Sequence, residues 1–327
     1  MSFTMDHTRR VQESEGQGSR LYCRVFDSHR REDTKYMITS LGNSRIKHLT
    51  ALREKSRDRN REGLFLAEGI KMFEEAPLDQ IREVYCGESF YGHLINGRSE
   101  GNAVEALRLE KVFHKLEECQ ERGIFTEQLS DEVLKKAADT MTPQGILFVM
   151  EQFSYSLEDM LKRALRIFQQ KGKNPLFLIL EDIQDPGNLG TMIRTGEGAG
   201  VSGVILSKGC VDIYNPKTIR STMGSLYRVP FVYREDLGEA VKELQKNHIT
   251  VYAAHLKGEN YFDRIDYRGG SAFLVGNEGN GLKEETAKLA DTYIKIPMEG
   301  SLESLNAAVA AALLLYQAAG SSRKDGE

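Results

Sequence analysis

The feature that most limits the fold of this chain is a series of six short, almost wholly apolar runs in its second half. They are LFLILE, GVILS, RVPFV, ITVYAAH, SAFLVG and YIKIPM, at 176–181, 203–207, 228–232, 249–255, 271–276 and 293–298. Helix-like segments separate them. Apolar runs that are continuous rather than alternating predict strands covered on both faces, as in a mostly parallel sheet with helices on each side. We therefore predict an α/β protein whose C-terminal domain is a doubly wound, mostly parallel sheet.

The first half of the chain predicts a smaller α/β domain. Asn43 or Ser44 can cap a helix that carries Ile46, Leu49 and Leu52 on one face. Three strand-like runs follow at 63–69, 81–87 and 145–150. A length of 327 residues agrees with about two domains, because a typical domain has roughly 100 to 200 residues.

The domain boundaries follow from changes in composition. Gly172 and Pro175 end a helix expected from residue 156 onward, and this punctuation is typical of a linker. The expected division is a disordered tail at 1–37, a small domain at 38–150, a linker at 151–174, a C-terminal domain at 175–320 and a second tail at 321–327. The first tail mixes 7 basic with 6 acidic residues and shows no apolar period.

Composition also indicates where the protein works. No apolar stretch approaches the roughly 18 to 20 residues of a spanning helix, and the N-terminus has no apolar core like that of a secretion signal. The cysteines, Cys23, Cys86, Cys119 and Cys210, are too widely spaced for a zinc site or a disulfide framework. The histidines likewise show no metal-ligand spacing. We expect a cytoplasmic protein without a metal ion and without a membrane partner.

The charge of the chain is distributed unevenly. The net charge of -4 disfavours a nucleic-acid partner for the molecule as a whole, but residues 45–61 carry seven basic and two acidic side chains. Two interpretations stay open for this segment, an RNA contact and a solvated helix face with internal ion pairs. The candidate RNA-binding residues are Arg45, Lys47, Arg53, Arg57, Arg59 and Arg61.

Three loops after strands of the C-terminal domain carry the candidate chemistry. In parallel sheets, ligands bind beyond the carboxyl ends of the strands. The first loop, 181–200, begins EDIQDPGN and leads into a helix; the second, 276–282, reads GNEGNGL; the third, 296–316, enters an alanine-rich helix expected to begin at Ser304. The glycines of the second loop let the backbone approach a ligand closely, and a simple tight turn is the alternative.

A dinucleotide fingerprint at Gly198, Gly200 and Gly203 has the wrong context. That motif needs a strand before it and a helix after it. Here a helix ends and a strand follows, so these glycines are expected to terminate the helix. A nicotinamide-dependent dehydrogenase is therefore disfavoured.

The three loops, in this order, resemble the three motifs of the SpoU (TrmH) family of RNA ribose 2'-O-methyltransferases. Asn188 and Arg194 stand six apart in the first motif, Gly276 and Glu278 lie in the second, and the third includes 296–297 and 304–306. The small domain, through residues 44–76, looks like the L30e-like substrate-binding domain of many members. Residues 1–37 lie outside the resemblance.

The resemblance implies a fold and a set of functional residues. The implied fold is a deep trefoil knot of the SPOUT type, with an S-adenosylmethionine pocket in the knotted loops and a homodimer formed by the C-terminal domain. The implied cofactor-binding residues are Leu274, Gly276, Asn277, Glu278, Gly279, Ile296, Met298 and Leu305. The implied catalytic set around the methyl group and the ribose is Arg194, Asn188, Glu278, Ser304 and Asn306.

Simpler roles stay open for several of these residues. The family mechanism makes Arg194 the base, but a guanidinium is rarely free to accept a proton, so Arg194 could instead grip a substrate phosphate. Glu278 could be a loop carboxylate bonded to N–H groups, and Ser304 and Asn306 could cap a helix. The resulting hypothesis is S-adenosylmethionine-dependent 2'-O-methylation of structured RNA, with 23S-type rRNA favoured over tRNA. The alternatives are a tRNA methyltransferase and a non-catalytic RNA-binding or ribosome-assembly protein on the same fold.

Overall fold

The structure, a computed structural model, describes residues 37–96, 103–301 and 303–323. They form two compact units that divide after Glu151. Most of the first expected tail and the last four residues lie outside this description. The last helix runs to Arg323, so the chain is helical over the first three residues of the second expected tail.

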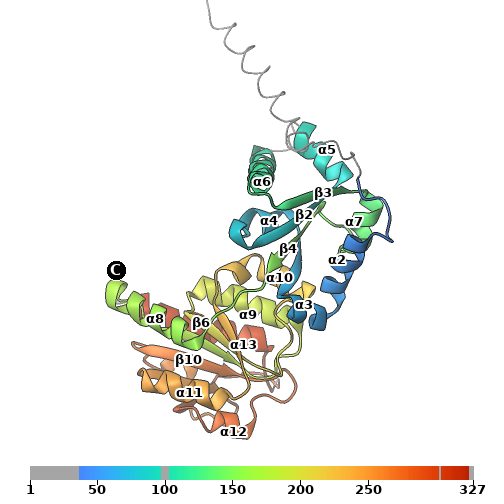
Figure 1. Cartoon of the computed structure of the whole chain (residues 1–327). Coiled ribbons are helices and arrows are strands. Elements are labelled where there is room, and N and C mark those ends of the chain that lie inside the picture. Colours follow the sequence, from blue (N-terminus) through green and yellow to red (C-terminus); the bar gives the residue numbers. More distant parts are fainter. Residues whose placement is uncertain (1–36, 97–102, 302, 324–327) are drawn as a thin grey trace, which may run out of the picture. The chain divides into compact units, whose positions relative to one another are not determined.

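The first unit is a mixed four-stranded sheet with helices on both faces (Figure 1). Its described strands are β1 (Leu64–Glu68), β2 (Ile81–Gly87), β3 (Phe125–Leu129) and β4 (Ile146–Glu151), in the order β1-β4-β2-β3. Its described helices are α2 (Ser44–Glu54), α3 (Ser56–Glu62), α4 (Ile70–Glu75), α5 (Glu88–Asn96), α6 (Ala103–Glu121) and α7 (Asp131–Ala137). The predicted strands and the α2 cap at Asn43 are confirmed, and β3 was not predicted.

The apolar face of α2 explains how this unit closes. Ile46, Leu49 and Leu52 are all buried, and they pack with α7 and one face of the sheet in a single core cluster. Phe73 of α4 meets Phe148 of β4 edge-on across the other face, with ring centroids 5.3 Å apart. The unit is therefore a three-layer α/β sandwich.

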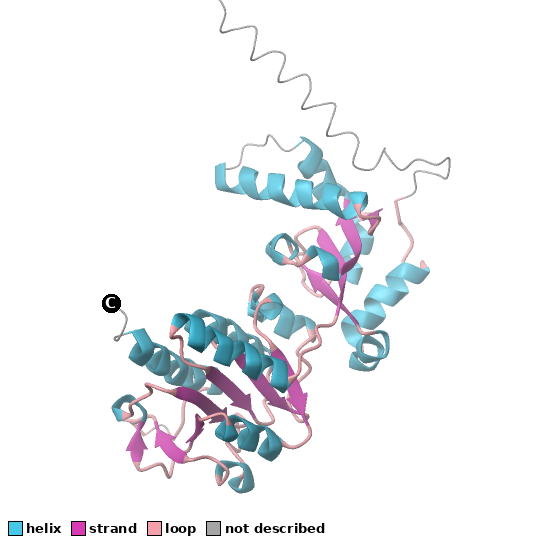
Figure 2. Ribbon diagram, turned by 60° about the vertical axis from the view of Figure 1, so that its left-hand side comes forward, coloured by secondary structure: helices cyan, strands magenta, loops and turns pink. Residues whose placement is uncertain are grey.

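The second unit is a parallel sheet of seven described strands between two layers of helices (Figure 2). The strands are β5 (Leu176–Leu180), β6 (Gly203–Ser207), β7 (Phe231–Arg234), β8 (Ile249–Ala254), β9 (Asn260–Tyr261), β10 (Gly270–Val275) and β11 (Thr292–Lys295). Their order is β7-β6-β5-β10-β8-β11-β9, and every pairing is parallel. The predicted α/β class and mostly parallel sheet are confirmed, whereas the trefoil knot stays a prediction.

Helices cover both faces of this sheet. The described helices are α8 (Leu157–Lys171), α9 (Pro186–Ala199), α10 (Pro216–Thr222), α11 (Leu237–Lys246), α12 (Glu284–Ala287) and α13 (Ala307–Arg323). Helices α8 and α11 share one core cluster with alternate residues of β5, β8 and β10. Helices α9 and α13 pack against each other, and α13 also packs on β5 and β10.

The expected linker at 151–174 is instead part of the second unit. Leu157, Met160, Leu161 and Ala164 recur at helical spacing on α8 and are almost completely buried in the core of the sheet. Gly172 ends α8 in the left-handed conformation, with φ +66°, and Pro175 precedes β5. Gly172 and Pro175 therefore mark the end of a core helix and not a linker between domains.

Candidate active site at the carboxyl edge of the parallel sheet

The three motif loops all begin at one edge of the second sheet. Because β5, β10 and β11 are parallel, their carboxyl ends point the same way, and β10 lies directly beside β5. The loops that follow these strands start at residues 181, 276 and 296. The sheet order therefore brings together segments that are about 100 residues apart in sequence.

A chain of side-chain hydrogen bonds joins the three loops through Asn188. The Asn188 amide Nδ2 donates to Glu278 Oε1 at 3.0 Å, and Asn306 Nδ2 donates to Asn188 Oδ1 at 3.0 Å. Asn306 Oδ1 accepts from the backbone N–H groups of Ala308 and Val309 at 2.9 and 3.3 Å. A carboxylate accepts only and a helix N-terminus donates only, so the two ends of the chain fix the orientation of both amides.

Helix caps place two members of this chain. Asp185 accepts from the Asn188 N–H at 2.8 Å and caps α9, with Pro186 at the first position of the helix. Asn306 caps α13, which begins at Ala307. Ser304 was expected to begin this helix, but it lies in the irregular segment before it. An asparagine satisfies the same orphan N–H groups, which explains the later start.

The Glu278 carboxylate accepts hydrogen bonds from the backbone and from a side chain of the first loop. It accepts from the N–H groups of Gln184 at 3.1 Å and Asp185 at 3.2 Å, in addition to Asn188. Partial burial raises the pKa of Glu278, but these hydrogen bonds outweigh burial and the pKa lies below its ordinary value. Glu278 is therefore a fixed anion at neutral pH, and the simpler role as a loop carboxylate is part of the observed geometry.

The second loop is a tight turn. Asn277 and Gly281 exchange both backbone hydrogen bonds, at 3.0 and 2.9 Å, and Gly281 has a φ of +69°. A Cβ on Gly276 would lie 2.2 Å from backbone atoms of Gly281 and Leu282. Close packing of the loop on itself thus requires glycine at 276, so the tight turn held open in the sequence analysis is present.

Arg194 and Ser304 lie outside the hydrogen-bond chain. Arg194 is exposed on α9, six residues after Asn188, which places it about 9 Å further along the helix axis. Neither side chain forms a hydrogen bond or ion pair with any residue that the structure describes. Their catalytic roles stay predictions.

The expected cofactor residues divide into two groups. Leu274 is completely buried within β10 and packs in the core, so its side chain does not reach a pocket. Ile296, Met298 and Leu305 stay partly exposed in the irregular segments after β11. Apolar side chains left partly exposed at a polar edge fit a ligand with an apolar ring.

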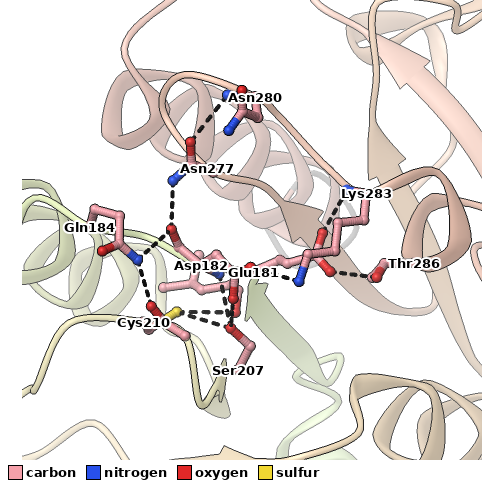
Figure 3. Close-up of polar contacts among 11 residues, drawn as sticks. Glu181, Asp182, Gln184, Ser207, Cys210, Asn277, Asn280, Lys283 and Thr286 are labelled. Atoms are coloured by element: carbon pink, nitrogen blue, oxygen red, sulfur yellow. Dashed lines mark hydrogen bonds and ion pairs between the residues drawn. The ribbon is translucent and has the colours of Figure 1, made fainter.

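An acidic pair directly after β5 was not predicted from the sequence. Glu181 is 4% exposed; its carboxylate accepts from the backbone N–H of Lys283 at 2.8 Å and from the Thr286 hydroxyl. Asp182 forms an ion pair with Lys283 at 2.7 Å and accepts from the Ser207 hydroxyl at 2.7 Å (Figure 3). Two carboxylates next to a wholly apolar strand, at the edge where ligands bind, were the signal in the sequence.

Four of the seven cations in residues 45–61 form contacts with other groups of the first unit. Arg45 stacks on the Phe125 ring at 3.6 Å and pairs with Glu83, while Arg61 pairs with Asp58 and Glu62. Arg53 donates to the carbonyl groups of 136–138 at the end of α7. Arg59 was expected to contact RNA, but it is 3% exposed, and its guanidinium bonds to carbonyls at the end of α2.

Replacing Arg59 with alanine should destabilise the first unit. The change leaves the carbonyls of Leu52 and Arg53 without this donor and opens a cavity, for an expected loss of about 2–4 kcal/mol in the free energy of unfolding. Urea unfolding followed by circular dichroism measures it. Arg57→Ala, at an exposed position of the same helix, is the control and should change stability by less than about 0.5 kcal/mol. Equal stability of the two variants would contradict the structural role.

Two general features of the described residues bear on function. No group of three or more His, Cys, Asp or Glu side chains among them is arranged to hold a metal ion. No helix in the described part of the chain is long and apolar enough to cross a membrane.

The fold and this edge together define a doubly wound α/β domain of the ligand-binding kind, accompanied by a separate small unit. Comparison with known proteins gives the family. Residues 175–316 match the SpoU rRNA Methylase family, and residues 43–147 match the MRM3-like substrate binding domain.

Individual relatives agree with the family match. The chain is 32% identical, over 86% of its own length and 99% of the relative, to the 23S rRNA (guanosine(2553)-2'-O)-methyltransferase RlmP of Bacillus subtilis. It resembles an rRNA methyltransferase from Sinorhizobium meliloti solved with AdoMet bound, with a TM-score of 0.70 and 28% identity over 89% of this chain and 98% of that one. The AviRb methyltransferase of Streptomyces viridochromogenes, also solved with AdoMet, gives a TM-score of 0.66 at 26% identity over 87% of this chain and 100% of that one.

The chain belongs to the SpoU family of RNA methyltransferases. This confirms the family that its three loops predicted from sequence.

Proposed function

We propose that this protein transfers a methyl group from S-adenosylmethionine to a ribose 2'-hydroxyl in structured RNA of the 23S type. The observation that supports it most strongly is the hydrogen-bond chain of Glu278, Asn188 and Asn306, which holds all three family loops in one place. The relative named as a 23S rRNA 2'-O-methyltransferase aligns over 99% of its length, so both units have counterparts in it. This favours rRNA over tRNA.

The residues of this edge suit the reaction. Ile296, Met298 and Leu305 would contact the adenine, and the backbone of the 276–282 turn would hold the rest of the cofactor. When bound, the cofactor supplies an electrophilic methyl group on a sulfonium. In that transfer the carbon–sulfur bond would break as the ribose oxygen bonds to the methyl carbon, the sulfonium would leave as a neutral thioether, and the hydroxyl proton would pass to solvent. The chain's contribution is positioning, which lowers the barrier by several kcal/mol when the reacting atoms are held in line.

Arg194 completes the proposed site. Its guanidinium has no described partner, so it is available to grip a phosphate of the RNA bidentately beside the reacting ribose. The amides of Asn188 and Asn306 then orient the ribose, while Ser304 contributes a hydroxyl from the segment before α13. These roles are proposals for this chain.

The test combines two measurements on the full chain. Calorimetric titration with S-adenosylmethionine should show binding, and a radiolabelled-methyl assay on rRNA lacking the modification should show incorporation that nuclease digestion assigns to a 2'-O-methyl nucleotide. Incorporation into tRNA alone would favour the tRNA alternative. Binding of rRNA without methyl transfer would favour a ribosome-assembly protein and would overturn the proposed reaction.

We propose that the exposed cations of the α2–α3 region contact the RNA backbone. Lys47, Lys55 and Arg57 are exposed, and their side chains have no hydrogen-bond or ion-pair partner among the described residues. Replacing all three with glutamine should weaken RNA affinity and reduce the slope of log affinity against log salt by about 2 to 3, because each lost phosphate contact lowers the slope by roughly 0.9. Filter binding at several salt concentrations measures this. An unchanged slope, or altered cofactor affinity, would contradict the assignment.

We also propose that the second unit forms a homodimer through α13. Val309, Leu313 and Tyr316 are 49%, 39% and 50% exposed, and their spacing places them in one stripe along the helix. The Tyr316 hydroxyl lies against Gly198 of α9, one turn after Arg194, so a second copy covering the stripe would lie near Arg194. The resemblance implied such an arrangement.

Leu313→Lys should convert the dimer to monomer. A lysine in the centre of an apolar interface would be buried without a partner. Sedimentation velocity at micromolar concentration measures the change. Leu256→Lys is the matched control, because Leu256 is an exposed apolar residue outside α13. A monomeric wild-type protein would contradict this proposal without affecting the proposed reaction.

A further inference from the structure

The Glu181–Asp182 pair is connected to the second loop at three points (Figure 3). The carbonyl of Asp182 accepts from Asn277 Nδ2 at 2.8 Å, at the start of the turn. The Asp182 carboxylate pairs with Lys283 Nζ at 2.7 Å, and Glu181 accepts from the Lys283 N–H, just after the turn. Two consecutive residues at the end of β5 thus hold both ends of the loop on the edge of the sheet.

The two carboxylates are themselves rigidly placed. Asp182 has a φ of +53°, a left-handed conformation that aspartate and asparagine adopt more readily than most residues. The Ser207 hydroxyl at the end of β6 donates to its carboxylate and accepts from its N–H at 2.9 Å. Glu181 is almost fully buried and continues the pairing with β10 through its N–H. These bonds tie the two carboxylates to the edge of the sheet.

The ion pair is open to solvent on its Lys283 side. Asp182 and Lys283 line a cavity of about 640 Å³ at this edge. The Lys283 side chain is 56% exposed and the Asp182 side chain 26% exposed. Residues 277–281 are partly or fully exposed, so the position of the turn depends on these polar contacts, whereas Leu282, directly after the turn, is buried in the core of the sheet.

The same loop carries the residues of the proposed function. Asn277 Oδ1 accepts from the N–H groups of Gly279 and Asn280 at 2.9 and 3.1 Å, so the side chain held by Asp182 also shapes the turn. Glu278, the next residue, contacts Asn188 of the first loop. A displacement of the loop would move the cofactor-binding backbone and the Glu278 carboxylate together.

We propose that Asp182 and Lys283 are positioning residues for the methyl donor: their ion pair, with Glu181 beneath it, holds the turn at 277–281 in the conformation that binds S-adenosylmethionine. The inference rests on the proposed function, because it assumes that this loop binds the cofactor. Breaking the pair lets the loop populate other conformations. If the competent fraction falls to about one tenth, the apparent Kd rises about tenfold.

The test uses two variants that each remove one charge from the pair. Asp182→Asn keeps a residue that tolerates the left-handed backbone, and Lys283→Met alters a half-exposed side chain, so both should fold. Each is expected to raise the calorimetric Kd for S-adenosylmethionine about tenfold. With saturating cofactor and RNA, kcat should stay within about twofold of wild type, because the bound cofactor selects the competent loop. A variant with a damaged fold would instead lose kcat and thermal stability together.

Three further variants sharpen the result. Lys283→Arg retains the ion pair and should keep the wild-type Kd, whereas the double variant Asp182→Asn/Lys283→Met should be no weaker than either single change, because both remove the same interaction. Lys162→Met removes an exposed ion pair with Glu158 on α8 and serves as the control. It should leave the Kd unchanged.

The outcomes separate the inference from the proposed function. Wild-type protein that fails to bind S-adenosylmethionine overturns the proposed function. Wild-type binding with an unchanged Kd in Asp182→Asn overturns the inference alone, and so does tighter binding by that variant, which would mean that Lys283 contacts the cofactor directly and is restrained by Asp182. Multiplication of the two single effects in the double variant also overturns it.

Discussion

Replacing Arg194 with alanine is expected to lower the rate of methyl transfer at least about a hundredfold while cofactor affinity and thermal stability stay close to wild type. The side chain is exposed and has no hydrogen-bond or ion-pair partner among the described residues, so its removal takes no polar contact away from the fold. Any large effect must therefore come from the RNA complex. Single-turnover methyl transfer with saturating RNA and cofactor measures the chemical step.

A matched control exists on the opposite face of the sheet. Arg166 is an exposed arginine on α8, and α8 covers the face away from α9 and α13. Arg166→Ala removes the same charge from the same unit and should transfer methyl groups at the wild-type rate. Near wild-type activity of Arg194→Ala would contradict the proposed role in either of its forms.

Arg194→Lys separates the two forms of that role. A lysine can hold a phosphate as a point charge, so a phosphate clamp should retain a measurable part of the rate, with a flat pH profile above neutrality. A base at this position must lose a proton first, so the wild-type rate would rise with pH toward alkaline values and the lysine enzyme would level off near its own pKa of about 10.4. The dependence of the single-turnover rate on pH decides between them.

Much of the second unit was predictable because its strands are buried on both faces. The runs at 176–181 and 203–207 are apolar at nearly every position, and both became strands. The strand β3, FTEQL, was missed because its residues are half polar and mostly half buried, so it lacks a strong pattern. The helix α8 was predicted, but it was placed in a linker because Gly172 and Pro175 were given more weight than its four buried residues at helical spacing.

The sequence indicated which loops carry the site, but it did not indicate which of their side chains contact one another. The three loops could be selected because parallel strands put ligand-binding residues at their carboxyl ends. The bond between Asn188 and Glu278 depends on β10 lying beside β5, an order that sequence periodicity does not determine. Arg59 shows the same limit, because seven similar cations in one segment give no sign of which one turns inward.

Asn188 lies in the middle of the hydrogen-bond chain, between Glu278 and Asn306. Asn188→Asp should therefore lower kcat/KM about a hundredfold at neutral pH. The new carboxylate would stand about 3 Å from the Glu278 carboxylate in place of a donor, and two such groups cannot both be ionised without a large cost. Repulsion would displace the loop at 276–282 from the first loop. The variant would then lose both the amide donor and the geometry of the site.

The pH dependence of this variant has a definite sign. In the wild-type protein the pKa of Glu278 is lowered, so the group stays ionised throughout the neutral range. In Asn188→Asp the first proton taken up by the carboxyl pair binds with a raised pKa and restores a hydrogen bond between them. Activity relative to wild type should therefore increase as the pH falls from 8 toward about 5.

Asn306→Asp is the control with the same change in charge. An aspartate caps a helix as well as asparagine does and lies favourably at the N-terminus of α13, so stability should be preserved. It replaces the bond donated to Asn188 Oδ1 with a contact between two acceptors, but the Asn188 donor and the Glu278 acceptor that form the other contact are unchanged. We expect a smaller loss of activity than in Asn188→Asp, without recovery at low pH. If the two variants lost activity equally and with the same pH dependence, charge alone would explain the effect and the directed chain of hydrogen bonds would have no part in it.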